Sequence, residues 1–429
     1  MPGDVTGAVG LGVFLVVVAL IVIRPRGISE ALVATLGALA VVGLGLLSPM
    51  DALAALSASV PLLLFFLGLM VISAIAEEAG FFDEMARWAV LHSHGSPRRL
   101  LVNMFLVGTA ITALLTNDAT ALVLTPVVYV LVTRLKLAPT PFVFACTFVA
   151  DAASFVLPIS NPVNIILLST ADMRLDRYLL HLLPAATVAI GANLVAILWL
   201  FRGQLVGHVH HDLIPPPVGS VGYLQQTRLA LGAIALGYVV ATSVGIHVGI
   251  IAIVGGGLMA VVALTQRRLD GRRLVRTISW PLFPFIAGMV VLVQVVERVG
   301  VTTLVAEVFG GLASASPPVA IATVTFVVAL AANLMNNIPA ALVVAEALHS
   351  PGLAGETGVT LRYAAVLGAD LGPNVSVTGS LATMLWLMML RVRGLHISSL
   401  QYLRLGTVVT VPALTLGAFA LWLSSAVMN

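Results

Sequence analysis

The sequence predicts an all-α polytopic membrane protein with two inverted-topology repeats, about 10 transmembrane helices, and two re-entrant helical hairpins. Three observations support this prediction: the composition, a match between the two halves of the chain, and the distribution of arginines. Of the 429 residues, 60% are hydrophobic and 9% are charged, whereas soluble domains carry about 25% charged residues. Apolar runs of about 17–25 residues recur along the chain. We therefore expect a multi-pass protein of the cell inner membrane, in contact with the lipid bilayer.

The two halves of the chain resemble each other. The segment Pro61–Gly80 aligns without gaps to Pro281–Gly300, 220 positions later. Polar residues coincide at the same offset or within one position of it, and the matched pairs are Glu77 with Glu297, Asn117 with Asn337, Asp151 with Asp370, and Ser160 with Ser380. Polar matches spread over about a hundred residues indicate an internal duplication, as in many transporters.

The predicted elements follow in order along the chain. Residues 1–27 form an N-terminal transmembrane helix, which we expect to be retained because its apolar run precedes Arg24 and Arg26, the reverse of a secretory signal. Repeat 1 covers 28–201, with a re-entrant hairpin near 100–133 and a broken helix near 141–170. A polar, proline-rich linker covers 202–228. Inverted repeat 2 covers 229–428, with a hairpin near 318–348 and a broken helix near 361–390.

The arginines fix the predicted orientation. If each hairpin enters and leaves on one side, each half crosses the membrane an odd number of times, so the halves are inverted. All but four of the 21 basic residues then fall on the linker side, the exceptions being Arg174, Arg177, Arg298 and Arg362. The positive-inside rule places the linker in the cytoplasm and both termini outside.

Four polar segments interrupt the apolar runs, at 116–118, 151–164, 333–339 and 370–380. Prolines and glycines in three of them remove backbone donors or permit unusual backbone, and two of the transmembrane helices are predicted to be unwound there. Backbone leaves the helix at membrane depth only where it lines a cavity or is buried in protein. Broken helices within inverted repeats are the arrangement of secondary transporters.

Three aspartates within these breaks are candidate proton-coupling residues: Asp118, Asp151 and Asp370. A charged aspartate at membrane depth costs roughly 3 kcal/mol or more, so it needs a partner, a proton or a function. Asp118 has no acidic equivalent in the second half, where Ile338 aligns with it, which suggests a coupling role confined to one repeat. The neutral polar residues have a simpler explanation available, because asparagine and serine also satisfy backbone groups freed at a break or cap a helix. Glu77 and Glu297 are interpreted as capping or ion-paired residues at helix ends.

Other motifs limit the classes of function. Cys146 is the single cysteine, so an internal disulfide and a site with several thiolates are excluded. Lys136 is the only lysine and no phosphate-binding loop surrounds it, so energy must come from an ion gradient, from a separate ATPase subunit, or from none, as in a channel. The stretch His208–Asp212 is interpreted as a solvated loop. We predict no cofactor, no resident metal, no nucleic-acid partner and no enzyme activity.

Four stretches resemble a known family: "LTNDATALVLTP", "FVADAASFVLPISNPVNIILL", "NNIPAAL" and "GADLGPNVSVTGSLATMLWL". They are similar to the arsenical pump membrane proteins, the ArsB-type arsenite/antimonite efflux permeases of the ion transporter superfamily. The resemblance implies a scaffold domain, and a transport domain whose hairpins and unwound helices surround the substrate. It also implies export of arsenite and antimonite driven by protons, or with a cytoplasmic ATPase subunit. Matched to these motifs, the hairpin tips are Thr116, Asn117 and Asp118 in the first repeat and Asn337 in the second, and the unwound segments carry Asp151, Ser160, Asn161, Asp370, Thr378 and Ser380.

The chemistry of arsenous acid fits such a site. It is a small, neutral trihydroxide, so asparagine, serine and threonine groups can hydrogen-bond it without burying a net charge. A neutral substrate gains nothing from the membrane potential, and uphill efflux therefore needs coupling. The hypothesis is that Asp118 or Asp151 takes up a proton outside and releases it inside.

Two alternatives remain. A sodium/proton antiporter of the same superfamily would use Asp118, Asp151 and Asp370 as sodium ligands with backbone carbonyls. An intramembrane aspartyl protease would use Asp151 and Asp370, although "GADLG" departs from the GxGD pattern of those enzymes.

Overall fold

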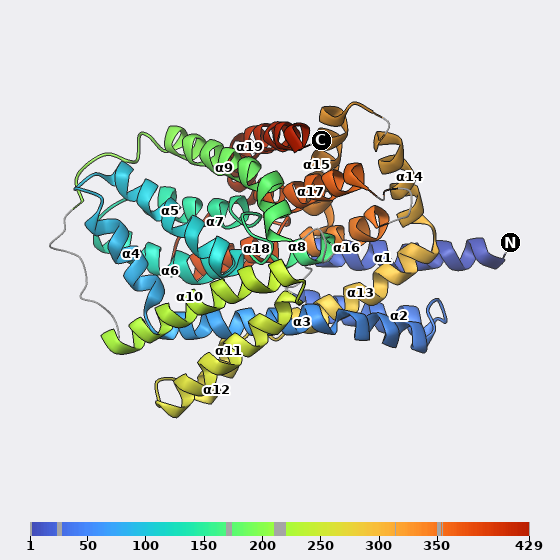
Figure 1. Cartoon of the computed structure of the whole chain (residues 1–429), viewed down its shortest axis with the longest axis horizontal. Coiled ribbons are helices and arrows are strands. Elements are labelled where there is room, and N and C mark those ends of the chain that lie inside the picture. Colours follow the sequence, from blue (N-terminus) through green and yellow to red (C-terminus); the bar gives the residue numbers. More distant parts are fainter. Residues whose placement is uncertain are drawn as a thin grey trace.

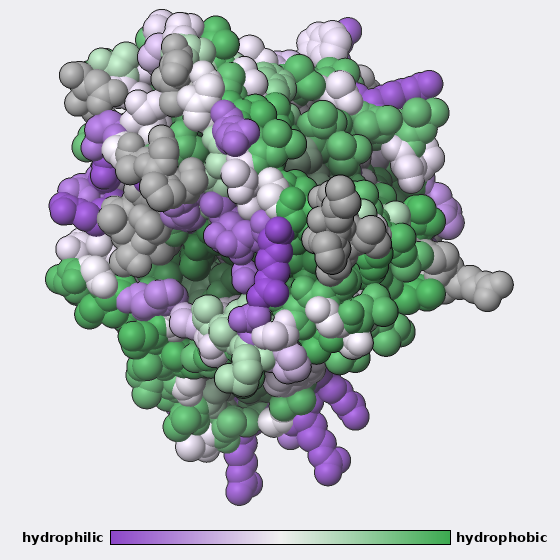
Figure 2. Space-filling model, turned by 90° about the vertical axis from the view of Figure 1, so that its right-hand side faces the viewer, coloured by the Kyte–Doolittle hydropathy of each residue, from purple (hydrophilic) through white to green (hydrophobic). Residues whose placement is uncertain are grey.

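The computed structural model describes residues 2–23, 28–168, 174–209, 220–313, 315–349, 353 and 355–428, and all regular structure in these ranges is helical. Arg24 and Arg26, residues 210–219 of the predicted linker and the end of the first broken helix lie outside the described residues. Seven helices within the described ranges are long and apolar enough to cross a bilayer. In Figure 2, hydrophobic residues cover much of the visible face, as expected for a multi-pass membrane protein.

The helices of the first half are α1 Pro2–Ile23, α2 Glu30–Gly43, α3 Pro49–Glu78, α4 Phe81–Leu91, α5 Pro97–Leu114, the π-helical η2 Ala119–Leu124, α6 Thr125–Arg134, α7 Thr140–Ala152, α8 Pro162–Leu167 and α9 Leu175–Leu200. The helices of the second half are α10 Val221–Val244, α11 Val248–Thr265, α12 Gly271–Thr277, α13 Leu282–Arg298, α14 Val301–Ala313, α15 Pro317–Met335, α16 Asn337–Leu348, α17 Glu356–Leu371, the 3₁₀-helical η5 Gly372–Val375, α18 Leu381–Val392 and α19 Ser399–Met428 (Figure 1).

The helices pack as two groups. In one group, α3 packs on α11 and α13 packs on α2, with α1 and α10 alongside. In the other, α9 packs on α19, and the helices on either side of the polar breaks gather around them. In Figure 1, α2 and α3 run along the lower part of the molecule, α11 and α13 run obliquely to them, and the second group fills the upper part.

Matched helices of the two halves run in opposite directions. Arg298, at the end of α13, pairs with Asp51 at the start of α3. Arg273, which precedes α13, pairs with Glu78 at the end of α3 at 2.8 Å. In the same way, the Ser424 hydroxyl near the end of α19 donates to the His181 carbonyl near the start of α9. The pairs α3/α13 and α9/α19 are therefore both antiparallel.

Three short helices, α4, α12 and α14, are absent from the sequence prediction. Helices α4 and α14 each follow directly after a glycine with left-handed backbone, Gly80 (φ 77°) and Gly300 (φ 84°), 220 positions apart. Glycine adopts this conformation without the steric penalty of a Cβ atom, so the chain turns sharply at the end of α3 and of α13. The search for long apolar runs missed α4 and α14 because they are short and amphipathic.

One predicted boundary differs clearly from the structure. Helix α10 begins at Val221, inside the predicted linker 202–228. Tyr223 and Leu224 are buried, and Arg228 pairs with Glu84 of α4 at 2.8 Å. These tertiary contacts stabilise eight polar-rich residues as helix that sequence composition alone assigns to a loop.

Candidate transport site

The first hairpin tip lies between α5 and η2 and is held by its own side chains. The Thr116 hydroxyl accepts a hydrogen bond from the Ala119 amide at 3.1 Å, and the Asn117 side-chain oxygen accepts one from the Asp118 amide at 3.0 Å. The Thr116 contact reaches an amide three positions on and is a helix cap, whereas the Asn117 contact is to the next residue of the chain. The capping residue at this tip is therefore Thr116 rather than Asn117.

The first broken helix docks against this tip. The Asn117 amide donates to the Ser160 carbonyl at 3.2 Å, and the Ser160 hydroxyl donates to the Ala113 carbonyl at 2.9 Å. Asn161 precedes Pro162, the first residue of α8, and its side-chain oxygen caps that helix by accepting from the Val163 amide at 3.1 Å. The tip and the break therefore form one hydrogen-bonded unit.

The second hairpin tip is tied to the second break in the same manner. Asn336 has left-handed backbone (φ 75°), and the Asn337 amide donates to the Gly379 carbonyl at 3.0 Å. Ser380 then caps α18 by accepting from the Thr383 amide at 3.2 Å. Within the described part of each half, the tip asparagine is bound through its backbone to the unwound segment of the neighbouring broken helix.

A network of neutral polar groups covers the second tip. The Asn333 side-chain amide donates to the Gly372 carbonyl at 2.8 Å, and its oxygen accepts from the Ser376 hydroxyl at 2.7 Å. The Thr378 hydroxyl donates to the Asn333 carbonyl at 3.1 Å and lies 3.1 Å from the Ser376 hydroxyl. This network holds two hydroxyl groups in fixed positions beside the break.

Asp151 and Asp370 lie deep between the two breaks, with 2% and 0% of their surfaces exposed. The Asn117 side-chain amide donates to Asp151 Oδ1 at 3.5 Å, and the Asn161 side-chain amide donates to Asp370 Oδ1 at 2.8 Å. The Oδ2 atom of each aspartate is buried without a hydrogen-bond partner among the described residues, as are the side-chain oxygens of Asn164 and Asn374. Four acceptor oxygens in one buried region suit either bound protons or a cation.

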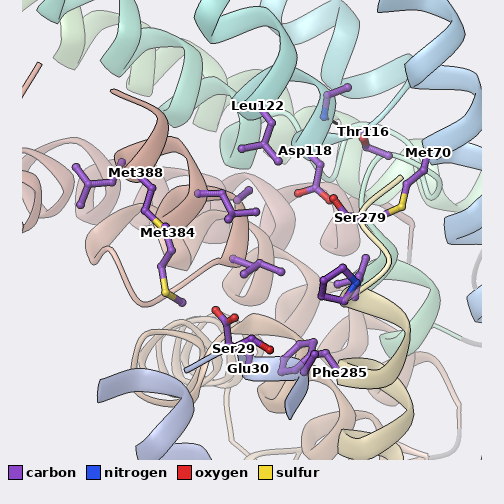
Figure 3. Close-up of a pocket in the computed structure, with 18 of the residues that line it drawn as sticks. Ser29, Glu30, Met70, Thr116, Asp118, Leu122, Ser279, Phe285, Met384 and Met388 are labelled. Atoms are coloured by element: carbon purple, nitrogen blue, oxygen red, sulfur yellow. Dashed lines mark hydrogen bonds between the residues drawn. The ribbon is translucent and has the colours of Figure 1, made fainter. Parts of the chain in front are cut away.

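A cavity of about 1080 Å³ opens beside the first tip. Of the residues proposed from sequence, Thr116, Asp118 and Thr378 line it. Figure 3 shows Thr116 and Asp118 at one end of the cavity, with Ser29, Glu30 and Phe285 at the other end and Met384 along the side. The remaining candidates are buried behind the wall: Asn117, Asp151, Ser160, Asn161, Asn337, Asp370 and Ser380. The structure therefore separates three residues that meet the cavity from seven that support its wall.

Sequence reasoning missed several residues of the cavity wall. Glu30 lies at the start of α2 and lines the cavity, and its place as an acid within an apolar run could have signalled it. Ser376 lies within the second predicted broken helix and also lines the cavity, but a serine at a break is equally explained as a partner for freed backbone groups. Ser279 carries no sequence signal, because it lies in the short connection between α12 and α13.

Other motifs remain outside the site. His208 lies against Gly95, the Val209 amide donates to the Gly95 carbonyl at 2.9 Å, and residues 210–212 fall outside the described residues. Cys146 is buried within α7. Within the ranges described, no cluster of three or more histidine, cysteine, aspartate or glutamate side chains is arranged to hold a metal ion.

Comparison with known proteins identifies the family. A family model described as citrate transporter matches residues 17–368. The arsenical pump membrane protein of Escherichia coli K12 is 31% identical over 424 residues, covering 96% of this chain and 98% of that protein. The chain belongs to the arsenical pump membrane protein family. The Yersinia enterocolitica arsenical pump membrane protein is 33% identical over 371 residues, covering 84% and 86% of the two chains.

More distant comparisons agree with a transporter fold for this arsenical pump family member. An uncharacterised transporter of Mycobacterium tuberculosis is 27% identical over 425 residues, covering 96% of this chain and 98% of that protein. The YdaH transporter structure of Alcanivorax borkumensis superposes with a TM-score of 0.55 at 14% identity, covering 88% of this chain and 86% of that one. The chain is thus a multi-pass membrane transporter, in line with the expectation drawn from its motifs.

Proposed function

We propose that this transporter exports trivalent arsenite and antimonite from the cytoplasm in exchange for protons. The observation that carries the proposal is the wall at the first hairpin tip, where the Thr116 hydroxyl and the Asp118 carboxyl meet a cavity that also exposes Ser376 and Thr378. Hydroxyl and carboxyl groups can donate to and accept from the three hydroxyls of a neutral metalloid acid. The names of the most similar curated relatives support the same substrate class.

The charge of the cavity favours a neutral substrate over citrate, which the broad family model names. Three carboxyl side chains line it, those of Glu30, Glu77 and Asp118, against one guanidinium, that of Arg391. Like charges repel strongly where water is scarce, so a tricarboxylate would meet an unfavourable potential. A small uncharged acid would not.

Proton coupling would run through two aspartates of the first half. Asp118 faces the cavity, and Asp151 lies behind Asn117, close enough for its charge to interact with that of Asp118. The next acceptor for a proton that binds Asp118 from the cavity would be Asp151. Transfer beyond Asp151 would require the hairpin tip to change its contacts. A separate ATPase subunit is not needed for this scheme.

The proposed orientation follows the arginines. The cavity lining includes Arg391 and Thr277, which follows Arg276, so the cavity reaches the end of the molecule that carries most basic residues. With the linker in the cytoplasm and both termini outside, this form of the protein is open inward. The antiparallel pairs α3/α13 and α9/α19 support the inverted repeats. The packing partners support them as well, because α3 packs on α11, whereas its counterpart α13 packs on α2, the counterpart of α11.

A sodium/proton antiporter is the second candidate, and one observation favours it. Four buried oxygens lack hydrogen-bond partners within the described chain, on Asp151, Asp370, Asn164 and Asn374. Carboxylate and carboxamide oxygens are ligands for hard cations. In that case the cation would sit between the two breaks, behind the cavity wall.

The test is transport in everted membrane vesicles with an acidic interior and no ATP. We expect uptake of arsenite and antimonite that collapses when a protonophore is added and is absent from vesicles without the protein. Uptake that survives the protonophore would instead indicate a channel. Uptake that appears only when the assay is repeated with ATP would indicate an ATPase partner. No metalloid uptake, but proton release on adding sodium, would replace the proposal with the antiporter.

A further inference from the structure

The corner between α11 and α12 concentrates positive charge at the surface. Within ten residues it carries Arg267, Arg268, Arg272, Arg273 and Arg276, against the single acid Asp270. Asp270 is engaged as the cap of α12, since its carboxylate accepts from the Arg272 amide at 3.3 Å. Arg267 has left-handed backbone (φ 51°) directly after the end of α11, where the chain turns toward α12.

Two of these arginines are bound within the molecule and three project outward. Arg273 pairs with Glu78 at 2.8 Å, and the Arg268 guanidinium lies 5.9 Å from the centre of the Tyr223 ring. Arg267, Arg272 and Arg276 are exposed. Hydrophilic side chains project from the lower edge of the molecule in Figure 2, the edge along which α11 and α12 lie in Figure 1.

Apolar side chains place this corner at the level of lipid headgroups. Val254, Leu258 and Val261 of α11 are spaced for one helix face and are 53%, 64% and 58% exposed, so that face meets the acyl chains. The arginines follow where this apolar face ends. Trp280, half exposed, donates its ring N–H to the Val275 carbonyl at 2.7 Å, and tryptophan favours the membrane interface.

We propose that the headgroups of anionic phospholipids bind this corner through Arg267, Arg272 and Arg276. Guanidinium groups bind phosphate with two parallel hydrogen bonds, and several of them around one headgroup favour a headgroup of net negative charge over a zwitterionic one. The corner leads directly into the cavity wall, because Thr277 and Ser279 line the cavity and Arg273 joins α12 to the end of α3 beside Glu77. Bound lipid therefore holds one wall of the transport cavity in position.

Lipid binding can be measured on the purified full-length protein in detergent, without any transported substrate. Fluorescent phosphatidylglycerol is expected to bind more tightly than fluorescent phosphatidylcholine. The triple variant Arg267→Gln, Arg272→Gln, Arg276→Gln should weaken phosphatidylglycerol binding by at least about tenfold. The control triple Arg98→Gln, Arg99→Gln, Arg134→Gln removes three exposed arginines elsewhere and should stay within about twofold of wild type. Thermal unfolding establishes that both variants are folded.

Three results would overturn the assignment: equal binding of the two lipids, equal loss in both triple variants, or displacement of lipid by millimolar inorganic phosphate. The link to the cavity has its own readout. In a Cys146→Ser background, an environment-sensitive dye on Ser279→Cys should change its emission when phosphatidylglycerol is added, and this change should vanish in the Arg267/Arg272/Arg276 triple variant. An unchanged emission would show that the lipid does not act on the cavity wall. Because these assays use no metalloid, their failure is distinct from failure of the proposed transport function.

Discussion

The two hairpin tips have the same backbone contacts and different chemistry. The Asn117 amide binds the Ser160 carbonyl and the Asn337 amide binds the Gly379 carbonyl, so each tip is docked on its broken helix alike. The residue that follows differs: Asp118 lines the cavity, whereas Ile338 is buried with 7% of its surface exposed. The difference teaches that like backbone contacts dock both tips in the same manner, while single residues decide which tip carries a titratable group.

The two buried aspartates differ in a related way. Asp151 is contacted by Asn117 of its own half at 3.5 Å, at the limit of a hydrogen bond, whereas Asp370 is contacted at 2.8 Å by Asn161 of the other half. Asp370 therefore ties the two broken helices together. Asp151 is held more loosely and lies next to the tip, which suits a group that changes partners during transport.

The largest effect is expected from removing the one acid that distinguishes the tips. Asp118→Asn keeps the size and polarity of the side chain but cannot exchange a proton. Proton-driven accumulation of arsenite in vesicles should fall to the level of vesicles without the protein, while downhill flux persists. The matched change on the other tip, Ile338→Val, should leave accumulation near wild type. Accumulation that persists in the Asn variant would contradict a coupling role for the first tip.

An intermediate effect is expected where the halves are most alike. Gly68 and Gly288 occupy matching positions in α3 and α13, and a Cβ atom there would lie 2.3 Å from the Ala252 backbone and 2.6 Å from the Ala34 backbone. Gly68→Ala and Gly288→Ala should each lower the free energy of unfolding by about 1–3 kcal/mol, because the crossing helices must separate.

Chemical denaturation of the purified protein would measure this effect. Gly257→Ala is the control, since a Cβ atom on this α11 glycine meets no atom within 4 Å. Destabilisation at only one of the two crossings would show that the halves do not pack equivalently.

The smallest effect is expected from the neutral network on the second tip. Ser376→Ala and Thr378→Val each remove one hydroxyl from the cavity wall, and a hydrogen bond of about 1 kcal/mol corresponds to roughly a fivefold rise in KM for arsenite. The pH dependence of uptake should stay unchanged, because neither side chain titrates. Thr415→Val, on an exposed part of α19, is the control. A similar rise in KM is expected for Thr116→Val at the first tip, and an unchanged KM in all three variants would contradict recognition by the hydroxyls of the cavity wall.

Much of this protein could be predicted from its sequence. The composition indicated a multi-pass membrane protein, and the quoted motifs indicated its family. The segments chosen as polar breaks contain the loops between α7 and α8 and between α17 and α18. These features are local, because a run of apolar residues or a proline acts on the backbone around it. Helices α4 and α14 escaped detection because glycine turns and amphipathic packing, rather than long apolar runs, produce them.

The sequence by itself determined the residue types available to the site: three aspartates in apolar surroundings, neutral amides and hydroxyls, one cysteine, and an excess of arginine over lysine. Only the tertiary structure decided which of them meet the cavity. Asp118 reaches it while Asp151 and Asp370 do not, and Glu30 joins it from a helix more than eighty positions earlier. The physical reason is that the cavity wall is assembled from both packing groups, so exposure to it depends on how distant helices cross rather than on any local pattern.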